Sequence, residues 1–309
     1  MCERPRGQTA LGQAAIFWDT TLEDATEIRR RVLMAFEEAE RITDTEQRRK
    51  LLTFVIVGGG PTGVELAGAI GEMSRYTLAK DFRSINARSA RVILLEAGPR
   101  ILPAFSEQQA ARATRDLERF GVQVWTSSGV TLIDENGVQV GTERLQAGTV
   151  LWAAGVQASP LGRIAGLETD PQGRVIVEPD LSVKGHPKVF VAGDQARCTH
   201  HTAKPLPGNA PVAMQQGRYI AHTILDELKG RPRRAFHFID KGQMATIGRS
   251  RAILEIGSIK LSGWLAWVAR LTVHIYYLTG FNNRLLVVLQ CTWSYVTFGR
   301  GARLIVGRR

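Results

Sequence analysis

The chain has 309 residues, 44% of them hydrophobic, so it is long enough to form two domains with substantial cores. Its three cysteines form no C-x-x-C or C-x4-C pair, which excludes a disulfide framework and a redox-active disulfide. The net charge of +11 is concentrated in residues 229–309, which hold 14 of the 40 Lys and Arg but only 2 of the 29 Asp and Glu, so this part suits an anionic membrane or a nucleic acid.

The first fifty residues predict one helix and little else. Residues 1–20 show no clear period, and they lack the basic start and apolar run of a signal peptide. Residues 22–41 place Ile28 and Phe36 on one face, which is typical of an amphipathic helix. We expect residues 43–50 to form a polar link into the next element.

A glycine-rich stretch follows. Residues 54–57 are apolar and rich in β-branched side chains, which predicts a buried parallel strand. Gly58, Gly60 and Gly63 come next at G-x-G-x-x-G spacing, and residues 64–73 have helical composition. The first glycine permits a tight turn, the second lets a pyrophosphate approach the backbone, and the third lets the helix pack closely on the strand. The phosphates would bind at the helix N-terminus; the alternative is a glycine-rich turn in another kind of α/β protein.

A second predicted strand, residues 91–95, ends in an acidic residue, Glu96. This acid lies further along the chain than the usual ~20 residues after the glycines, because the polar stretch 74–89 lengthens the connection. Its carboxylate would accept hydrogen bonds from the adenosine ribose. A carboxylate there disfavours a 2′-phosphate, so we expect NAD rather than NADP.

The next segments complete a nucleotide-binding domain that closes near Gly155. Gly155 ends a predicted strand, and a glycine at a strand end often marks close approach of the backbone to a ligand. The elements expected before it are a helix over 102–120, a strand over 122–125, a hairpin over 129–145 with its turn at 135–137, and a strand over 149–155.

The following hundred residues predict fewer elements. A short strand is expected over 174–177, and residues 189–194 predict a buried parallel strand that ends in Gly193 and Asp194. An acid at such a strand end suits a cofactor hydroxyl, although it could instead cap the next helix. Residues 210–228 predict that helix, whose Gln215 and Gln216 could equally be a solvated face. A Cys and two His lie within 198–201, but their spacing is poor, so we expect no metal site.

The C-terminal region predicts a membrane partner. Residues 261–280 have about the length that crosses a bilayer, but Arg270 and His274 lie near the middle, where charge is costly. Residues 285–298 form a second apolar segment. We expect two amphipathic segments lying in the membrane surface rather than one span, with the nearby Lys and Arg attracted to anionic lipid. Nucleic acid is disfavoured because no recognised binding module is present.

Five separate segments carry a family resemblance: VIVGGGPTGVELAG, LLEAGPRILP, VFVAGDQA, APVAMQQG and DKGQMATIGR. Together they resemble the type II NADH dehydrogenases, which are single-subunit NADH:quinone oxidoreductases that do not pump protons. The resemblance runs from about Leu22 to the C-terminus. It implies that NADH gives a hydride to FAD and that the reduced flavin passes two electrons to a membrane quinone. The family's membrane attachment is monotopic, here at the cytoplasmic face of the inner or plasma membrane. Family members are often homodimers, but no feature of this sequence indicates one.

The resemblance also assigns roles to residues. It places Glu65 near the nicotinamide and flavin, where it would help relay protons to the quinone. It places Asp194 at the ribityl chain of FAD, and Ala213, Gln215 and Gln216 beside the isoalloxazine. The expected catalytic residues are thus Glu65, Gln215 and Gln216, and the expected cofactor-binding residues are Gly58, Gly60, Gly63, Glu96, Gly155, Gly193, Asp194 and Ala213.

One departure from the family matters. The family has two glycine fingerprints, and this sequence has only the one for NADH. We therefore expect an N-terminally truncated member with an α/β fold, in which a Rossmann-like NADH-binding domain is inserted in an incomplete FAD-binding domain and a C-terminal amphipathic helical membrane anchor follows. The alternative function is a non-catalytic remnant that keeps NADH and membrane binding but cannot hold FAD. The expected divisions are an N-terminal remnant and linker helix (1–52), the NADH-binding domain (53–155), the returning half of the FAD-binding domain (156–250) and the membrane-associated region (251–309).

Overall fold

The computed structural model describes residues 15–18, 22–199, 204–277 and 284–289. The chain divides into two compact units. The first, unit 1, joins Met1–Ala154 to Gly242–Arg309, and the second, unit 2, is Gly155–Lys241.

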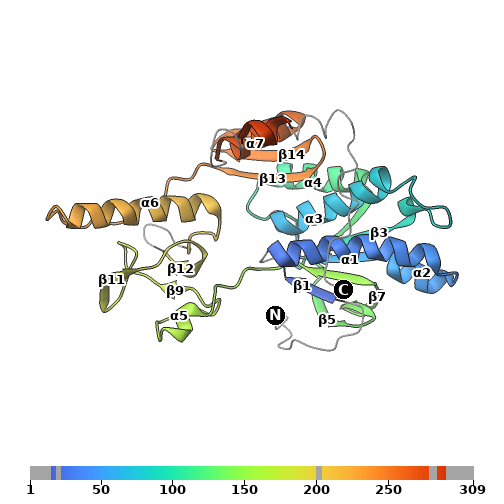
Figure 1. Cartoon of the computed structure of the whole chain (residues 1–309), viewed down its shortest axis with the longest axis horizontal. Coiled ribbons are helices and arrows are strands. Elements are labelled where there is room, and N and C mark those ends of the chain that lie inside the picture. The colour runs from blue at the N-terminus through green and yellow to red at the C-terminus, as the bar shows by residue number, and fades with distance from the viewer. Residues whose placement is uncertain (1–14, 19–21, 200–203, 278–283, 290–309) are drawn as a thin grey trace. The chain divides into compact units, whose positions relative to one another are not determined.

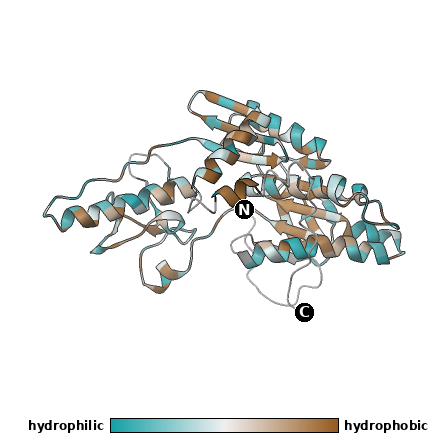
Figure 2. Cartoon of the chain, turned by 45° about the horizontal axis from the view of Figure 1, so that its top comes forward, coloured by the Kyte–Doolittle hydropathy of each residue, from teal (hydrophilic) through white to brown (hydrophobic). Residues whose placement is uncertain are grey.

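A five-stranded parallel sheet forms the centre of unit 1. Its order is β1-β8-β2-β3-β4, and every neighbouring pair is parallel. All five residues of β2 are buried, and the strands of this sheet are largely brown in Figure 2, as a sheet covered on both faces requires. The predicted strand over residues 54–57 is therefore confirmed, and it begins one residue earlier. The strands are β1 (Ala15–Trp18), β2 (Thr53–Val57), β3 (Arg91–Leu95), β4 (Val122–Trp125) and β8 (Thr149–Trp152).

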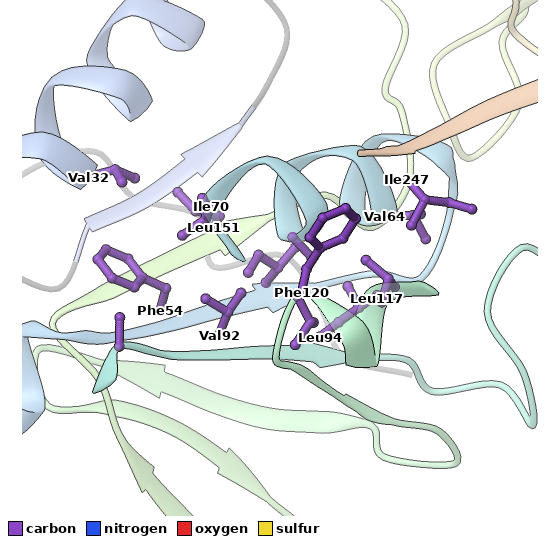
Figure 3. Packing of buried hydrophobic residues seen from close by; sticks show 14 of the residues in the cluster. Val32, Phe54, Val64, Ile70, Val92, Leu94, Leu117, Phe120, Leu151 and Ile247 are labelled. Carbon is purple, nitrogen blue, oxygen red and sulfur yellow. The ribbon is translucent and has the colours of Figure 1, made fainter. Parts of the chain in front are cut away.

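Helices pack on this sheet through a continuous apolar core. Phe54 and Leu94 from the strands meet Val64 and Ile70 from α3, and all four are at most 3% exposed (Figure 3). Leu117 closes the core from α4. The helices of this part are α1 (Leu22–Arg41), α2 (Thr45–Leu51), α3 (Pro61–Glu72) and α4 (Glu107–Arg119), with a π-helical turn η1 (Met73–Thr77) and a 3-10 turn η2 (Ala87–Ser89).

Three sequence predictions for unit 1 need correction. The expected polar link over 43–50 is largely α2, which begins there because the side chain of Asp44 accepts from the amides of Glu46 and Gln47. Residues 1–20 were expected to show no element, yet β1 pairs in parallel with β8. The helix expected from residue 102 begins only at Glu107, because Leu102 has a left-handed backbone with φ +50°.

A small antiparallel meander covers the other face of the parallel sheet. Its buried residues Val130, Val138 and Leu145 pack with Val55 and Ile93 from the sheet. The predicted hairpin over 129–145 is therefore present, extended by one further strand. The meander consists of β5 (Val130–Asp134), β6 (Gly137–Val140) and β7 (Glu143–Gln146), in the order β5-β6-β7.

A second antiparallel sheet lies between the layer of α3 and α4 and helix α7 (Trp264–Tyr277), as Figure 1 shows. Alternate residues of this sheet face opposite ways. Ile247 and Ile253 join the core beneath α3, while Ala252 and Leu254 pack with Ala266 of α7. The elements are β13 (Gln243–Gly248), β14 (Arg251–Ile256), β15 (Ile259–Gly263) and α7 (Trp264–Tyr277).

The expected amphipathic segment over 261–280 is thus divided, because residues 261–263 belong to β15 and residues 264–277 form α7; residues 278–280 lie outside the described part of the chain. Residues 284–289 are helical as well, whereas most of the second expected segment, 285–298, lies outside the described residues. Among the helices that the structure describes, none has the length and apolarity needed to cross a bilayer.

Unit 2 is built from short strands around one long helix. Leu181, Cys198, Val212 and Phe236 form its small core. The predicted buried parallel strand over 189–194 is wrong: β11 ends at Phe190, pairs antiparallel with β10, and is exposed along most of its length. The elements are α5 (Leu161–Ile164), β9 (Val175–Ile176), β10 (Ser182–Val183), β11 (His186–Phe190), the 3-10 turn η3 (Gly193–Gln195), β12 (Ala196–Arg197) and α6 (Ala210–Glu227).

Candidate functional site

The turn between β2 and α3 accepts only glycine at two of its positions. Gly58 has φ +113°, and a Cβ there would lie 2.7 Å from the amide nitrogen of Ala154. A Cβ on Gly63 would lie 1.8 Å from the carbonyl oxygen of Gly58. These two glycines therefore allow the sharp turn and the close packing of α3 that a dinucleotide fold requires.

Gly60 stands in open space at the start of α3. It is the N-cap residue, no side chain caps the helix, and a Cβ on it would meet no atom within 4 Å. The first amides of an α-helix have no partner within the helix, and together with the helix dipole they attract anions. The residues present thus fit a pyrophosphate, with the backbone of Gly60 on the open side of the turn.

Glu96 follows the C-terminal end of β3, beside the glycine turn. One oxygen, Oε2, accepts a hydrogen bond from the amide of Gly59 at 2.6 Å, and the other, Oε1, accepts from the amide of Gly98 at 2.6 Å. Each carboxylate oxygen has a second lone pair for a ribose hydroxyl. Sequence reasoning missed the role of Gly59, which is an unspecified position of the G-x-G-x-x-G pattern.

Glu65 lies one turn into α3, and its contacts come from far along the chain. Its Oε1 accepts from the amide of Thr246 on β13 at 3.1 Å and from Arg270 on α7 at 3.0 Å. The carboxylate therefore links the fingerprint helix to the C-terminal sheet and to α7. Arg270, which the sequence shows only as a charge inside an apolar segment, has an ion-pair partner in Glu65.

Four of the expected flavin-site residues meet in unit 2. Gly193 has φ +67° in η3, and a Cβ there would lie 3.2 Å from the Cβ of Ala213 on α6. Gln216 is 1% exposed, and its Oε1 accepts from the amide of Gly193 at 2.7 Å. Asp194 is the next residue and is exposed beside Gly208. Helix α6 therefore fixes the Gly193–Asp194 turn and leaves the Asp194 carboxylate outside.

Asp194 is not the cap of the next helix, and Gln215 is not part of a solvated face. The cap of α6 is Asn209, whose side chain accepts from the amide of Val212 at 3.1 Å, so Asp194 does not cap it. Gln215 is not a free solvated side chain either. Its Nε2 donates to the carbonyl of Ile239 at 2.9 Å, and its Oε1 accepts from the Ile239 amide at 3.0 Å. This pair of bonds fastens the chain near residue 239 to α6.

The expected site residues thus form two groups. Glu65 and the glycine-turn residues lie in unit 1, and the others lie in unit 2, where Gly155 is exposed with φ +80° and nothing near its Cβ position. Within the described residues, no three His, Cys, Asp or Glu side chains gather closely enough to bind a metal ion. The group in unit 1 is Gly58, Gly60, Gly63, Glu65 and Glu96, and the group in unit 2 is Gly155, Gly193, Asp194, Ala213, Gln215 and Gln216.

The glycine turn between β2 and α3 agrees with a family match. The sequence model of the pyridine nucleotide-disulphide oxidoreductase family matches residues 10–217, and the chain belongs to this family.

Individual relatives narrow the comparison. The chain is 42% identical over 301 residues to the type II NADH:quinone oxidoreductase Ndh of Mycobacterium tuberculosis, covering 94% of this chain and 64% of that protein. It is also 42% identical to NdhA of the same organism, covering 93% of this chain and 63% of that one. A solved structure of NDH2 from Plasmodium falciparum in complex with NADH matches with a TM-score of 0.82 at 16% identity, over 95% of this chain and 75% of that one. The resemblance to type II NADH dehydrogenases is therefore confirmed, and the chain spans about two thirds of these curated relatives.

Proposed function

We propose that this protein is an NADH:quinone oxidoreductase that carries electrons from NADH through FAD to a membrane quinone without pumping protons. The observation that carries the proposal is the glycine turn, open at Gly60 and flanked by the Glu96 carboxylate. The two relatives at 42% identity bear the same activity in their names, which supports it.

The residues of unit 1 account for NADH binding. The amides of the first turn of α3 would bind the pyrophosphate, since no side chain caps them. Glu96 would accept from the ribose hydroxyls through the lone pairs that Gly59 and Gly98 leave unused. A 2′-phosphate would bring negative charge against this carboxylate, so the site should select NADH over NADPH.

The residues of unit 2 account for flavin binding. Asp194 would accept from a ribityl hydroxyl, because it is exposed in the middle of η3. Gln216 and Ala213 hold the backbone of Gly193 beneath it, so a flavin would meet an ordered turn. A bound flavin supplies the hydride and electron transfer chemistry, and these residues supply its position. Glu65 is the residue we propose for moving protons toward the quinone, with its Oε1 held by Thr246 and Arg270.

Helix α7 would provide the membrane attachment. Large apolar or aromatic side chains stand exposed along it, and Ile256 and Ile259 are exposed on the hairpin before it. Trp and Tyr favour the interface between lipid and water, and an amphipathic helix lies in that plane. We therefore propose monotopic attachment to an anionic membrane surface, on its cytoplasmic side. The exposed side chains of α7 are Trp264, Leu265, Val273, Tyr276 and Tyr277.

The experiment measures flavin first. The purified chain is expected to carry close to one FAD per polypeptide, seen by absorbance near 450 nm, which bleaches with NADH and recovers with a soluble quinone. An Asp194→Asn variant should lower the FAD content, while Asp226→Asn, on the same unit but at the far end of α6, should not. A chain that takes up no FAD at all would leave NADH and membrane binding as its only activities, which is the alternative function.

A further inference from the structure

Gly59 is held at both of its backbone polar groups. It is buried, its amide donates to Oε2 of Glu96 at 2.6 Å, and its carbonyl oxygen accepts from the amide of Leu102 at 2.7 Å. Both of its backbone polar groups are therefore held by the segment that follows β3. We call Glu96 and Leu102 the clasp on Gly59.

The clasp closes one side of the turn and leaves the other side open. A Cβ on Gly59 would lie 2.9 Å from Oε2 of Glu96 and 2.9 Å from Cγ2 of Ile101, so both side chains would have to shift to admit a larger residue. A Cβ on the next residue, Gly60, would meet nothing within 4 Å. The side of the turn where the phosphates would bind is thus free, while the opposite side, at Gly59, is held by Glu96 and Leu102.

Leu102 reaches Gly59 through an unusual backbone conformation. Its φ of +50° lies in the left-handed region, which residues other than glycine rarely adopt. The side chain is 0% exposed in the main core, and its neighbour Ile101 is 1% exposed. Core packing therefore maintains a backbone conformation that aims the Leu102 amide at Gly59. Such maintained strain is characteristic of sites that must be held in one geometry.

We propose that Leu102 is a positioning residue for the dinucleotide site, acting with Glu96 to keep the glycine turn in its phosphate-binding form before the cofactor arrives. The inference rests on the proposed NADH site and identifies what orders it. A turn that is already ordered loses less conformational freedom on binding, so affinity rises without any new contact to the ligand. Leu102 itself need not touch NADH.

The first test needs no cofactor. Hydrogen exchange of residues 57–63 is measured in the FAD- and NADH-free chain for Leu102→Ala and for Leu117→Ala, which removes an equally buried leucine of the same core on α4. We expect exchange in the turn to become about tenfold faster in Leu102→Ala only, since local opening controls protection. Leu102→Met, which keeps the volume, should restore slow exchange. Equal exchange in the two alanine variants would overturn the proposal.

The second test measures NADH affinity. Leu102→Ala should raise the NADH dissociation constant about tenfold, because the disordered turn must be ordered again on binding. The value of kcat at saturating NADH should stay near that of the unmodified enzyme. Leu117→Ala should leave both values unchanged. A fall in kcat with an unchanged dissociation constant would contradict a positioning role. If the unmodified chain does not bind NADH, the proposed function fails, but hydrogen exchange still decides whether the clasp orders the turn.

Discussion

Arg270 in the middle of α7 donates a hydrogen bond to Glu65 on α3 at 3.0 Å, across 205 positions of sequence. The same carboxylate oxygen accepts from the amide of Thr246 on β13. One acidic side chain of the fingerprint helix therefore contacts both the sheet and the helix of the C-terminal region. The charge of Arg270 inside an apolar segment is explained by this partner.

The Glu65–Arg270 pair should make a small but measurable contribution to stability. Both side chains are about one third exposed, so solvent screens the attraction. A double-mutant cycle with Glu65→Gln and Arg270→Gln should give a coupling free energy of about 0.5 kcal/mol in urea unfolding. Glu65→Ala should cost more than Glu65→Gln, because the amide oxygen of Gln can still accept from Thr246. A coupling of zero would mean that the two groups do not interact in solution.

Asp116 should be far more important for stability than its position on α4 suggests. It is 0% exposed and contacts three arginines, with Arg251 of β14 at 2.7 Å, Arg119 at 3.1 Å and Arg112 at 3.4 Å. Asp116→Ala leaves these cations without their shared partner and should lower the free energy of unfolding by about 3 kcal/mol.

The matched control for Asp116 is Asp134→Ala on β5, whose carboxylate pairs with Arg144 at the surface. It should cost less than about 1 kcal/mol, because exposed ion pairs contribute little. Similar losses in the two variants would show that the burial of Asp116 does not set its contribution.

Two glycines of the α3 region should respond in opposite ways to alanine. A Cβ on Gly68 would lie 1.7 Å from the carbonyl oxygen of Ile247, so Gly68→Ala must force α3 away from β13 and should prevent normal folding. Gly60→Ala meets no neighbour, so its melting temperature should change little. Its methyl group would instead occupy the open side of the turn and weaken NADH binding about tenfold or more. Normal NADH affinity in Gly60→Ala would argue against a pyrophosphate at this turn.

The ion cluster on α1 predicts a pH dependence of stability. A side-chain hydrogen bond from Arg30 lowers the pKa of Glu27 to about 2; burial opposes this shift, and Arg31 reinforces it. Because the folded pKa lies below the ordinary glutamate value of 4.5, this stabilisation is fully present above pH ~4.5 and is lost as pH falls toward about 2. Glu27 is about one third exposed, so we expect only about 1 kcal/mol after screening. Urea unfolding of Glu27→Gln and the unmodified chain should differ most at neutral pH and converge as the pH approaches about 2. A difference that grows in acid would contradict the assignment.

The sequence predicts the parts of this structure whose causes are local. The apolar run of β2 and the glycine spacing identify the strand, the turn and the start of α3 within a dozen residues. The amphipathic pattern likewise identifies α1. These features depend on neighbours in sequence, so a period or a spacing is sufficient to find them.

The features that were missed depend on distant partners. Gly59 is crowded by Glu96 and Ile101, and the pairing of β1 depends on β8 more than a hundred residues away. The exposed β11 was predicted as buried because VFVA is apolar, and composition alone does not show how many strands surround it. The backbone contacts of Gln215 could not be foreseen either, since Ile239 lies in an irregular segment.

The attachment of α3 to β13 also has a consequence for substrate access. Gly68 brings the helix into backbone contact with Ile247, and Glu72 accepts from the amide of Arg249 at 2.8 Å further along. The 12-residue helix is roughly 18 Å long, and the glycine turn proposed to bind NADH stands at its N-terminal end. If α7 binds a bilayer, the orientation of the proposed NADH site relative to the membrane would therefore be fixed as well. A soluble cofactor would then always approach the enzyme from the same direction relative to the lipid plane.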